Sequence, residues 1–317
     1  QWEKPARRSV SPGQDSAKAV PGEGEVPLVG EVPSPLGETP SVPVSLPDHE
    51  LPPLPSFLEG PPFGADKDGK PIKQMPGAAL IASIRHMQDW VGMKTGEGLP
   101  STMDPQERQE KIAKAKAAAL DLLVERLNRV LADRRDTVSG EYLLNESNYY
   151  SHEFSLFLNE FARDISGDPG FHFHRGQKSI PAAIVKLARP FTLRQVYALV
   201  PRLTARVTDA DLRVTRTTTN SAVIQWHPGR QLAKLPPAVH RRYIHMACQA
   251  YQGVFAAIPF VHSKRPLAGI KQNSCLLQGE DCCEWEFTWE TAQFGVGMEV
   301  WGGAILSAAL LGYTLGR

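Results

Sequence analysis

The stretch from His245 to Trp289 decides how this chain folds. It opens His245-Met-Ala-Cys248-Gln-Ala-Tyr-Gln-Gly253 and closes with Cys275-Leu-Leu-Gln-Gly279-Glu-Asp-Cys282-Cys283-Glu-Trp285. All 4 cysteines of the 317-residue chain lie within it. Cysteines that serve only as small core residues have no reason to cluster. We therefore interpret the cluster as one site.

The spacing of the cysteines is compatible with metal binding. Cys275 and Cys283 are 283 − 275 = 8 positions apart across a turn, and Cys248 lies upstream on a predicted helix. Such ligands can surround a tetrahedral ion, and thiolates favour zinc. His245, on the same helical face as Cys248, is the expected fourth ligand, because the neutral amide of Gln272 is a poor donor. The alternative is a set of reduced structural thiols beneath a ligand pocket, since no CxxC pair is present.

The sequence around this site mixes strands and helices. Alternating residues over 212–219, 222–226 and 283–289 predict strands joined by short turns, hence an antiparallel sheet. Apolar residues at helical intervals predict helices from Phe154 to the turn at Ser166, over 180–188, over 192–205, and from about His245 to Gln252. Phe171–His174 alternates and predicts a short strand, and Phe255–Val261 reads as another. The fold class is therefore α+β, with flanking helices.

The chain before this domain divides into two parts. Residues 1–77 are rich in Pro, Gly and Ser, which predicts a disordered tail or linker. The run Leu51-Pro-Pro-Leu-Pro could dock in a partner's aromatic groove, and a passive spacer is the alternative. Residues 78–141 form a helical segment, with a long helix capped by Asp104. That helix packs on its own domain or, alternatively, forms a dimerisation coil.

The chain after the domain is apolar. We predict that the ligand-binding domain covers residues 142–290 and that residues 294–317 form a transmembrane helix. Val300–Leu315 carries no charge and many small residues. A buried glycine-rich core helix is the alternative.

The composition excludes some classes of protein. With 35 basic and 34 acidic residues the net charge is +1, which argues against nucleic-acid binding. No secretory signal is visible, and thiols at metal-like spacing favour a reducing compartment. We expect the folded domain in the cytoplasm, held at the cell membrane. The sequence contains no phosphate-binding glycine loop, nucleophile elbow or His-Glu zinc-hydrolase motif, so we do not expect an enzyme.

Residues from about 145 to 289 carry a resemblance to a known family. The motif that resembles the 4-vinyl-reductase-type domain of bacterial signalling proteins is, in chain order, Cys248, Gly253, Ile258-Pro259, Pro266, Cys275, Gly279, Cys283 and Trp285. The resemblance implies an α+β sensory fold that holds a small hydrophobic molecule. In phenol-sensing relatives, three cysteines and one glutamate bind zinc beside the pocket. The three cysteine positions match, and the glutamate position is Gln272 here.

The resulting prediction is a membrane-tethered bacterial sensory module that binds a small hydrophobic ligand and regulates an attached or partner output. We also expect a homodimer. The alternative is a non-catalytic assembly or scaffold subunit of a membrane complex. Aromatic residues are the candidates for lining the pocket, although each could be an ordinary core residue. They are Phe154, Phe157, Phe161, Tyr197, Trp226 and Phe255.

Overall fold

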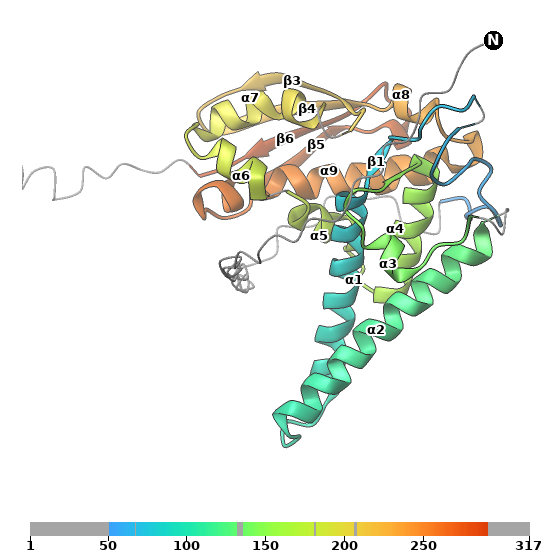
Figure 1. Cartoon of the computed structure of the whole chain (residues 1–317). Coiled ribbons are helices and arrows are strands. Elements are labelled where there is room, and N and C mark those ends of the chain that lie inside the picture. The colour runs from blue at the N-terminus through green and yellow to red at the C-terminus, as the bar shows by residue number, and fades with distance from the viewer. Residues whose placement is uncertain (1–50, 67, 132–135, 181, 206–207, 291–317) are drawn as a thin grey trace, which may run out of the picture. The chain divides into compact units, whose positions relative to one another are not determined.

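A computed structural model describes residues 51–66, 68–131, 136–180, 182–205 and 208–290. These residues form one antiparallel sheet and a set of helices, with a second, two-stranded pairing (Figure 1). The helices are α1 (Gly77–Gly98), α2 (Pro105–Val130), α3 (Gly140–Leu143), α4 (His152–Ser166), α5 (Phe171–Lys178), α6 (Ala182–Ala188), α7 (Leu193–Thr204), α8 (Gly229–Leu232) and α9 (His240–Ser263). The strands are β1 (Met75–Pro76), β2 (Tyr149–Tyr150), β3 (Asp211–Thr217), β4 (Ser221–His227), β5 (Gly269–Ser274) and β6 (Cys283–Thr288). Short 3-10 turns cover Pro237–Val239 and Leu276–Gln278.

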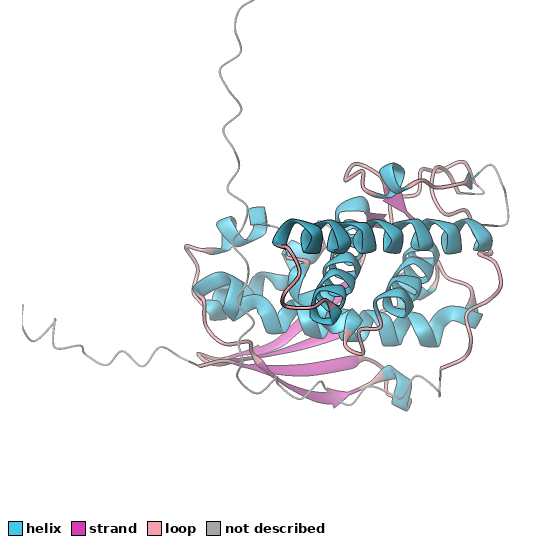
Figure 2. Ribbon diagram, turned by 90° about the horizontal axis from the view of Figure 1, so that it is seen from below, coloured by secondary structure: helices cyan, strands magenta, loops and turns pink. Residues whose placement is uncertain are grey.

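The main sheet has the strand order β3-β4-β6-β5, and every neighbouring pair is antiparallel. In the register, Ile224 of β4 and Gln272 of β5 both pair with Trp285 of β6. Figure 2 shows most of the helices on one side of this sheet. The other face is polar and carries pairs such as Arg216 with Glu286. The described part of the chain is thus α+β.

The buried apolar residues form two clusters. One joins the inner face of the sheet to α7 and α9 and contains Trp226, Phe255 and Trp285. The other joins α1, α2 and α4 and contains Leu123 and Phe157. Burial of these faces supplies the main favourable term in folding. Helix α4 contributes to both clusters, so the predicted helical segment 78–141 and the predicted domain 142–290 share a core.

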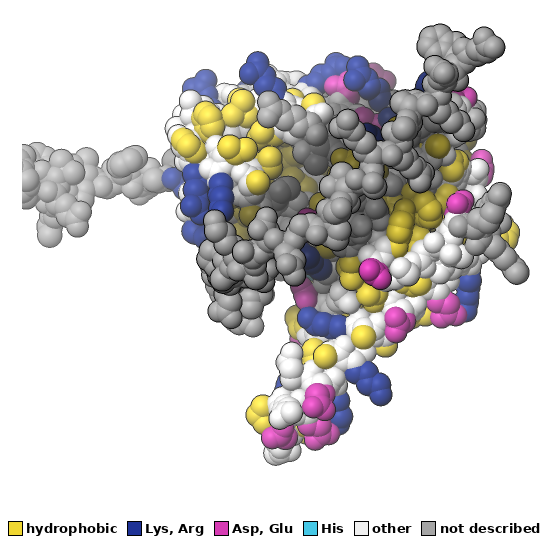
Figure 3. Space-filling model, in the orientation of Figure 1, with side chains coloured by type: hydrophobic (Ala, Val, Ile, Leu, Met, Phe, Trp, Pro, Cys, Tyr) yellow, Lys and Arg dark blue, Asp and Glu magenta, His cyan; other side chains and the backbone are white. Residues whose placement is uncertain are grey.

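Helix α2 follows its sequence signals closely. The side chain of Asp104 accepts hydrogen bonds from the backbone N–H groups of Gln106 and Glu107, and Pro105 occupies the first turn. Leu123 and Leu127 are fully buried. The exposed face carries charges of both signs (Figure 3). Helix α2 buries its apolar side chains against α1 and α4 of the same chain. It therefore packs on its own domain.

Helices α5 and α9 cross with their backbones almost in contact. A Cβ atom built on Gly253 would lie 2.1 Å from the carbonyl oxygen of Phe173, and one on Gly176 would lie 2.3 Å from that of Ala250. Real Cβ atoms do not approach so closely. Glycine is therefore required at both positions, one on each helix.

Helix α9 continues through a proline because another helix supplies the missing partner. Pro259 has no N–H, so the carbonyl oxygen of Phe255, four residues earlier, receives no helical hydrogen bond. The hydroxyl of Tyr197 on α7 donates to that oxygen at 2.8 Å. The prediction of a strand over Phe255–Val261 is therefore wrong, and the segment belongs to α9.

Two further predictions differ from the structure. Phe171–His174 is the first turn of α5 and not a strand. Residues 51–77, predicted as part of the tail, include buried Leu51, Leu58 and Ile72. The rest of the predicted tail, residues 1–50, lies outside the described residues.

The transmembrane prediction is also corrected. None of the described helices combines the length and the apolar character needed to cross a membrane, so that prediction is unsupported. Residues 294–317, to which it referred, lie outside the described part of the chain.

The α5–α9 crossing makes a testable prediction. We expect Gly253→Ala to lower the free energy of unfolding by about 2–3 kcal/mol, because the added methyl group forces two backbones apart. Gly98→Ala is the matched control, since nothing lies within 4 Å of a Cβ at that helical glycine. The control should be neutral or slightly stabilising. Equal effects of the two variants in urea unfolding would contradict the close crossing.

Candidate functional site

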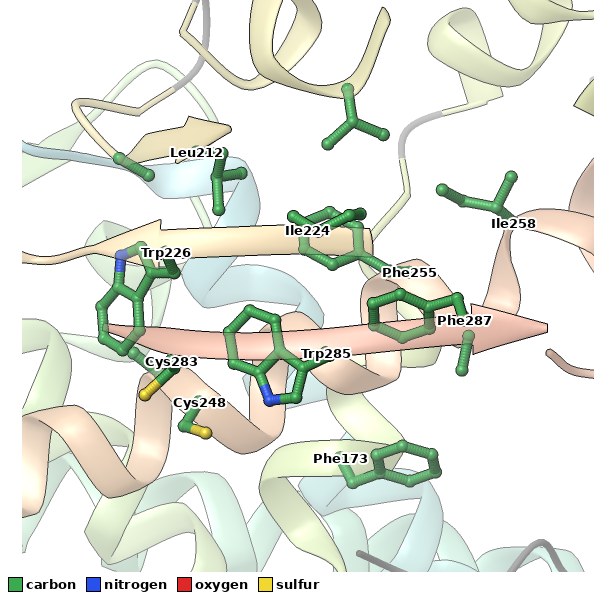
Figure 4. Close-up of a cluster of buried hydrophobic side chains, with 14 of the residues drawn as sticks. Phe173, Leu212, Ile224, Trp226, Cys248, Phe255, Ile258, Cys283, Trp285 and Phe287 are labelled. Atoms are coloured by element: carbon green, nitrogen blue, oxygen red, sulfur yellow. The ribbon is translucent and has the colours of Figure 1, made fainter. Parts of the chain in front are cut away.

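Three cysteines converge between helix α9 and the sheet. Cys248 lies on α9, Cys275 follows β5, and Cys283 begins β6. Their sulfur atoms all lie within 4.8 Å of one another, and the three residues are buried. Figure 4 shows Cys283 on the strand beside Cys248 on the helix. The sequence prediction that these thiols share one site agrees with this geometry. We call them the three-thiol cluster.

The local fold explains how the cluster forms. Trp226 of β4 pairs with Cys283, so the cysteine occupies a central strand and, like Trp285 and Phe287, points to the inner face. Gly279 adopts a positive φ of 93° after the short turn over Leu276–Gln278, and this reversal joins β5 to β6. A bulge between Gln272 and Ser274 breaks the regular pairing of β5 just before Cys275.

The three thiols share protons unequally. Hydrogen bonds from Cys248 and Cys283 lower the pKa of Cys275 far below the ordinary thiol value of 9.0. Hydrogen bonding to Cys275 and Cys283, together with burial, raises the pKa of Cys248 well above that value. The pKa of Cys283 is also raised: its bond with Cys248 opposes the shift, while the bond with Cys275 and burial outweigh it. The cluster thus favours one thiolate shared within its hydrogen bonds, and the directions of the three pKa shifts favour Cys275 as its position.

Side chains near the cluster connect it to its surroundings. The amide nitrogen of Gln252 on α9 donates to the sulfur of Cys248 at 3.4 Å and to the side-chain oxygen of Gln272 at 3.3 Å. Gln272 stands where the phenol-sensing relatives have a glutamate, and its side-chain oxygen accepts this hydrogen bond from a neutral amide. Cys282 lies outside the cluster and is partly exposed, and all four cysteines are free thiols.

His245 does not join the three-thiol cluster. It is buried on α9, where its Nε2 lies 3.1 Å from the amide nitrogen of Gln249. Its ring lies 6.4 Å from that of His172. Of the four predicted metal ligands, the structure therefore brings the three cysteines together and leaves His245 outside the group.

The predicted pocket residues divide between the two apolar clusters. Tyr197, Trp226 and Phe255 belong to the cluster of the sheet, α7 and α9. The remaining three lie on α4 within or against the cluster of α1, α2 and α4 and are Phe154, Phe157 and Phe161. The six side chains therefore do not line one common space.

Sequence reasoning missed Trp285 as a candidate site residue. Its side chain is fully buried, and its Nε1 has no hydrogen-bond partner in the described part of the chain. By contrast, the Nε1 of Trp226, equally buried, donates to Gln231 at 3.0 Å. Buried indole N–H groups usually find partners. Nothing in the local sequence distinguishes the two tryptophans, because their partners come from tertiary packing.

Comparisons with known proteins give limited information. No family model matches the sequence, and no curated protein does. Among solved structures, the chain is similar to the Fe(II) unliganded H-NOX protein from K. algicida, with a TM-score of 0.42 and 9% identity over 69% of this chain and 99% of that one. A mutant of the same protein matches with a TM-score of 0.39, the same identity and the same coverage. Similarity at this level assigns neither a family nor a ligand, and the resemblance to 4-vinyl-reductase-type domains stays a prediction.

The prediction of zinc as a cofactor is corrected. Its closed site required four ligands, and the group that could hold an ion contains the three cysteines without His245.

The proton arrangement of the cluster can be tested directly. Because the pKa of Cys275 lies below its ordinary value, we expect one thiolate per chain that persists as the pH falls from neutral. The ultraviolet absorbance of thiolate, measured in a pH titration of the reduced protein, reports it. Cys275→Ser should abolish this absorbance, and the control Cys282→Ser should retain it. The assignment would be contradicted if both variants kept the thiolate absorbance.

Proposed function

We propose that this chain is a bacterial sensory module that binds a small hydrophobic molecule against the inner face of the sheet and regulates a signalling output. The output is either attached to the chain or a separate partner. The observation that carries the proposal is the indole N–H of Trp285, which finds no hydrogen-bond partner among the described residues and lies in the core that also holds the three-thiol cluster. We propose no catalytic step for this chain.

A bound molecule would satisfy the indole. A buried donor without a partner costs about 1–3 kcal/mol, and an oxygen acceptor on a ligand would remove that cost. The surroundings suit an otherwise apolar molecule, since Phe173, Ile224 and Phe287 belong to the same cluster. In Figure 4 the indole nitrogen points to the side of the strand on which Phe173 lies. The ligand we propose is thus apolar, with one hydrogen-bond acceptor.

Helix α9 would transmit the occupancy of this position. One side of α9 faces the sheet through Cys248 and Phe255, and another meets α5 at Gly253. A molecule that binds more tightly to one spacing of sheet and helix shifts the population toward that spacing. Because the α5–α9 crossing is tight, α5 would move together with α9.

The free cysteines support an intracellular setting for the proposal. All four thiols are unpaired by disulfides, although three of them lie within 4.8 Å of one another. Proteins in reducing compartments keep their thiols in this state. We propose that the domain works in the cytoplasm. The predicted homodimer stays a prediction.

The proposal is tested with two probes of similar size. Phenol offers an oxygen acceptor to the indole N–H, and toluene does not. We expect phenol to raise the melting temperature of the full chain more than toluene does, because only phenol satisfies the buried donor. The difference between the two probes should vanish in Trp285→Phe.

Trp226→Phe is the matched control, because the indole of Trp226 is already paired with Gln231. This variant should keep the preference for phenol even though it loses a satisfied hydrogen bond. Absence of any shift with either probe, or the same preference in Trp285→Phe as in the wild type, would overturn the proposed function.

A further inference from the structure

A second cluster of potential ligands lies away from the three-thiol cluster. His86 of α1, Asp168 in the loop between α4 and α5, and His174 of α5 bring one ligand atom each within 4.8 Å of one another. The Nε2 of His86 lies 2.8 Å from Oδ2 of Asp168, and the Nδ1 of His174 lies 2.9 Å from the same oxygen. We call these residues the His-Asp-His cluster.

The geometry points to a binding site for a divalent first-row transition-metal ion at this cluster. Two imidazole nitrogens and a carboxylate oxygen form a set of donors that binds such ions in preference to Mg²⁺ or Ca²⁺. Two adjacent ligand atoms that each lie about 2.1 Å from an octahedrally coordinated ion are about 3 Å apart. The observed nitrogen–oxygen distances match such edges, so the three side chains could receive an ion with small adjustments.

The carboxylate is held in place by the loop that carries it. Its Oδ1 accepts the backbone N–H of Gly170 at 2.9 Å, and the backbone N–H of Asp168 donates to the hydroxyl of Ser166 at 3.2 Å. Such supporting hydrogen bonds fix the orientation of metal ligands. The side chain of Asp168 is fully buried, and within the described residues its ion pairs are with His86 and His174. A bound cation would neutralise this buried charge.

The rings of the two histidines are also fixed by packing. Trp90 stacks on His174 with centroids 5.9 Å apart and an interplanar angle of 19°, and its ring lies 6.1 Å from that of His86. A Cβ on Gly170 would lie 2.6 Å from Cε1 of His174, so glycine leaves room for the imidazole. The side chain of His174 is 28% exposed whereas that of His86 is 3% exposed. An ion would therefore enter from the side of His174.

The site would join two parts of the chain that are distant in the sequence, since Asp168 and His174 are 6 positions apart and His86 lies far from both. His86 and Asp168 are 82 positions apart, and α5 is the helix that crosses α9. An ion with these three ligands leaves coordination positions for water or a small ligand. Occupancy would thus fix α1 against the start of α5, independently of the position beside Trp285.

The test uses the full chain in its reduced state after removal of metal, with Ni²⁺ as the probe. We expect the wild type to bind one Ni²⁺ ion at this cluster in isothermal titration calorimetry. His174→Ala, which changes the most exposed ligand, should weaken this binding at least tenfold. His262→Ala is the control for loss of an imidazole elsewhere on the chain. The Nε2 of His262 lies 2.9 Å from the backbone oxygen of Phe191 and is not part of the His-Asp-His cluster. Cys275→Ser separates the site from the three-thiol cluster, and both controls should keep the ion.

Trp90 provides a second signal that a general loss of structure would not imitate. Ni²⁺ bound beside the stacked rings should quench the fluorescence of Trp90. Trp90→Phe should lose the quenching and keep the calorimetric binding, and Asp168→Asn should lose both. No Ni²⁺ binding in the wild type, or unchanged binding and quenching in His174→Ala, would overturn the proposal. The cluster would then be a metal-free hydrogen-bonded link between helices.

Discussion

The close contact between α5 and α9 is the constraint on which the rest of the structure depends. Glycines 176 and 253 let the two backbones meet, one on each side of the crossing. Helix α9 can then cover the sheet with one face and support α5 with another. Cys248 of the three-thiol cluster lies on the first face, and His174 of the His-Asp-His cluster lies on α5. A wider crossing would displace the two sites relative to each other.

Buried charges reinforce this arrangement where the two apolar clusters meet. Glu160 of α4 pairs with His172 of α5 at 3.0 Å and with Arg242 of α9 at 2.6 Å. Burial alone would raise the pKa of Glu160, yet the bond from His172 and the nearby cations lower it to about 2. Asp209 is held similarly by His152 and Lys234. Arg163 of α4 also pairs with Glu160, at 3.3 Å. The partners on α5 and α9 reach this carboxylate only when the three helices are docked, which favours one relative position of those helices.

Part of the fold could be predicted from local sequence. The cap at Asp104 and the alternation in β3, β4 and β6 are signals that a few neighbouring residues determine. The convergence of the three thiols was also predictable, because cysteines gathered in one stretch of an otherwise cysteine-free chain indicate a shared position. These features need no knowledge of partners far along the chain.

The remaining features depend on such distant partners. Phe171–His174 alternates like a strand, but four residues also fit one turn of a helix, and the packing against α9 decides between them. Gly253 and Pro259 resemble helix breakers, yet both lie inside α9. In the group of His86, Asp168 and His174, the last two are 6 positions apart, but His86 is 82 positions from Asp168 and no local spacing indicates it. The zinc and transmembrane predictions failed for another reason. The first extrapolated from cysteine spacing and a family resemblance to a closed four-ligand site, and the second extrapolated from an apolar composition to a membrane span.

The proline inside α9 makes a backbone hydrogen bond of this helix depend on a side chain of α7. The hydroxyl of Tyr197 has a pKa well above 10.0 because of its burial, so it remains a donor to the Phe255 oxygen at every physiological pH. An ordinary residue in place of Pro259 would restore the helical N–H, which would then share the Phe255 carbonyl oxygen with the phenol, because that oxygen can accept two hydrogen bonds. The two positions are therefore coupled in one direction: with proline at 259 the Phe255 oxygen depends on Tyr197 for its hydrogen bond, whereas a residue with an N–H would remove that dependence.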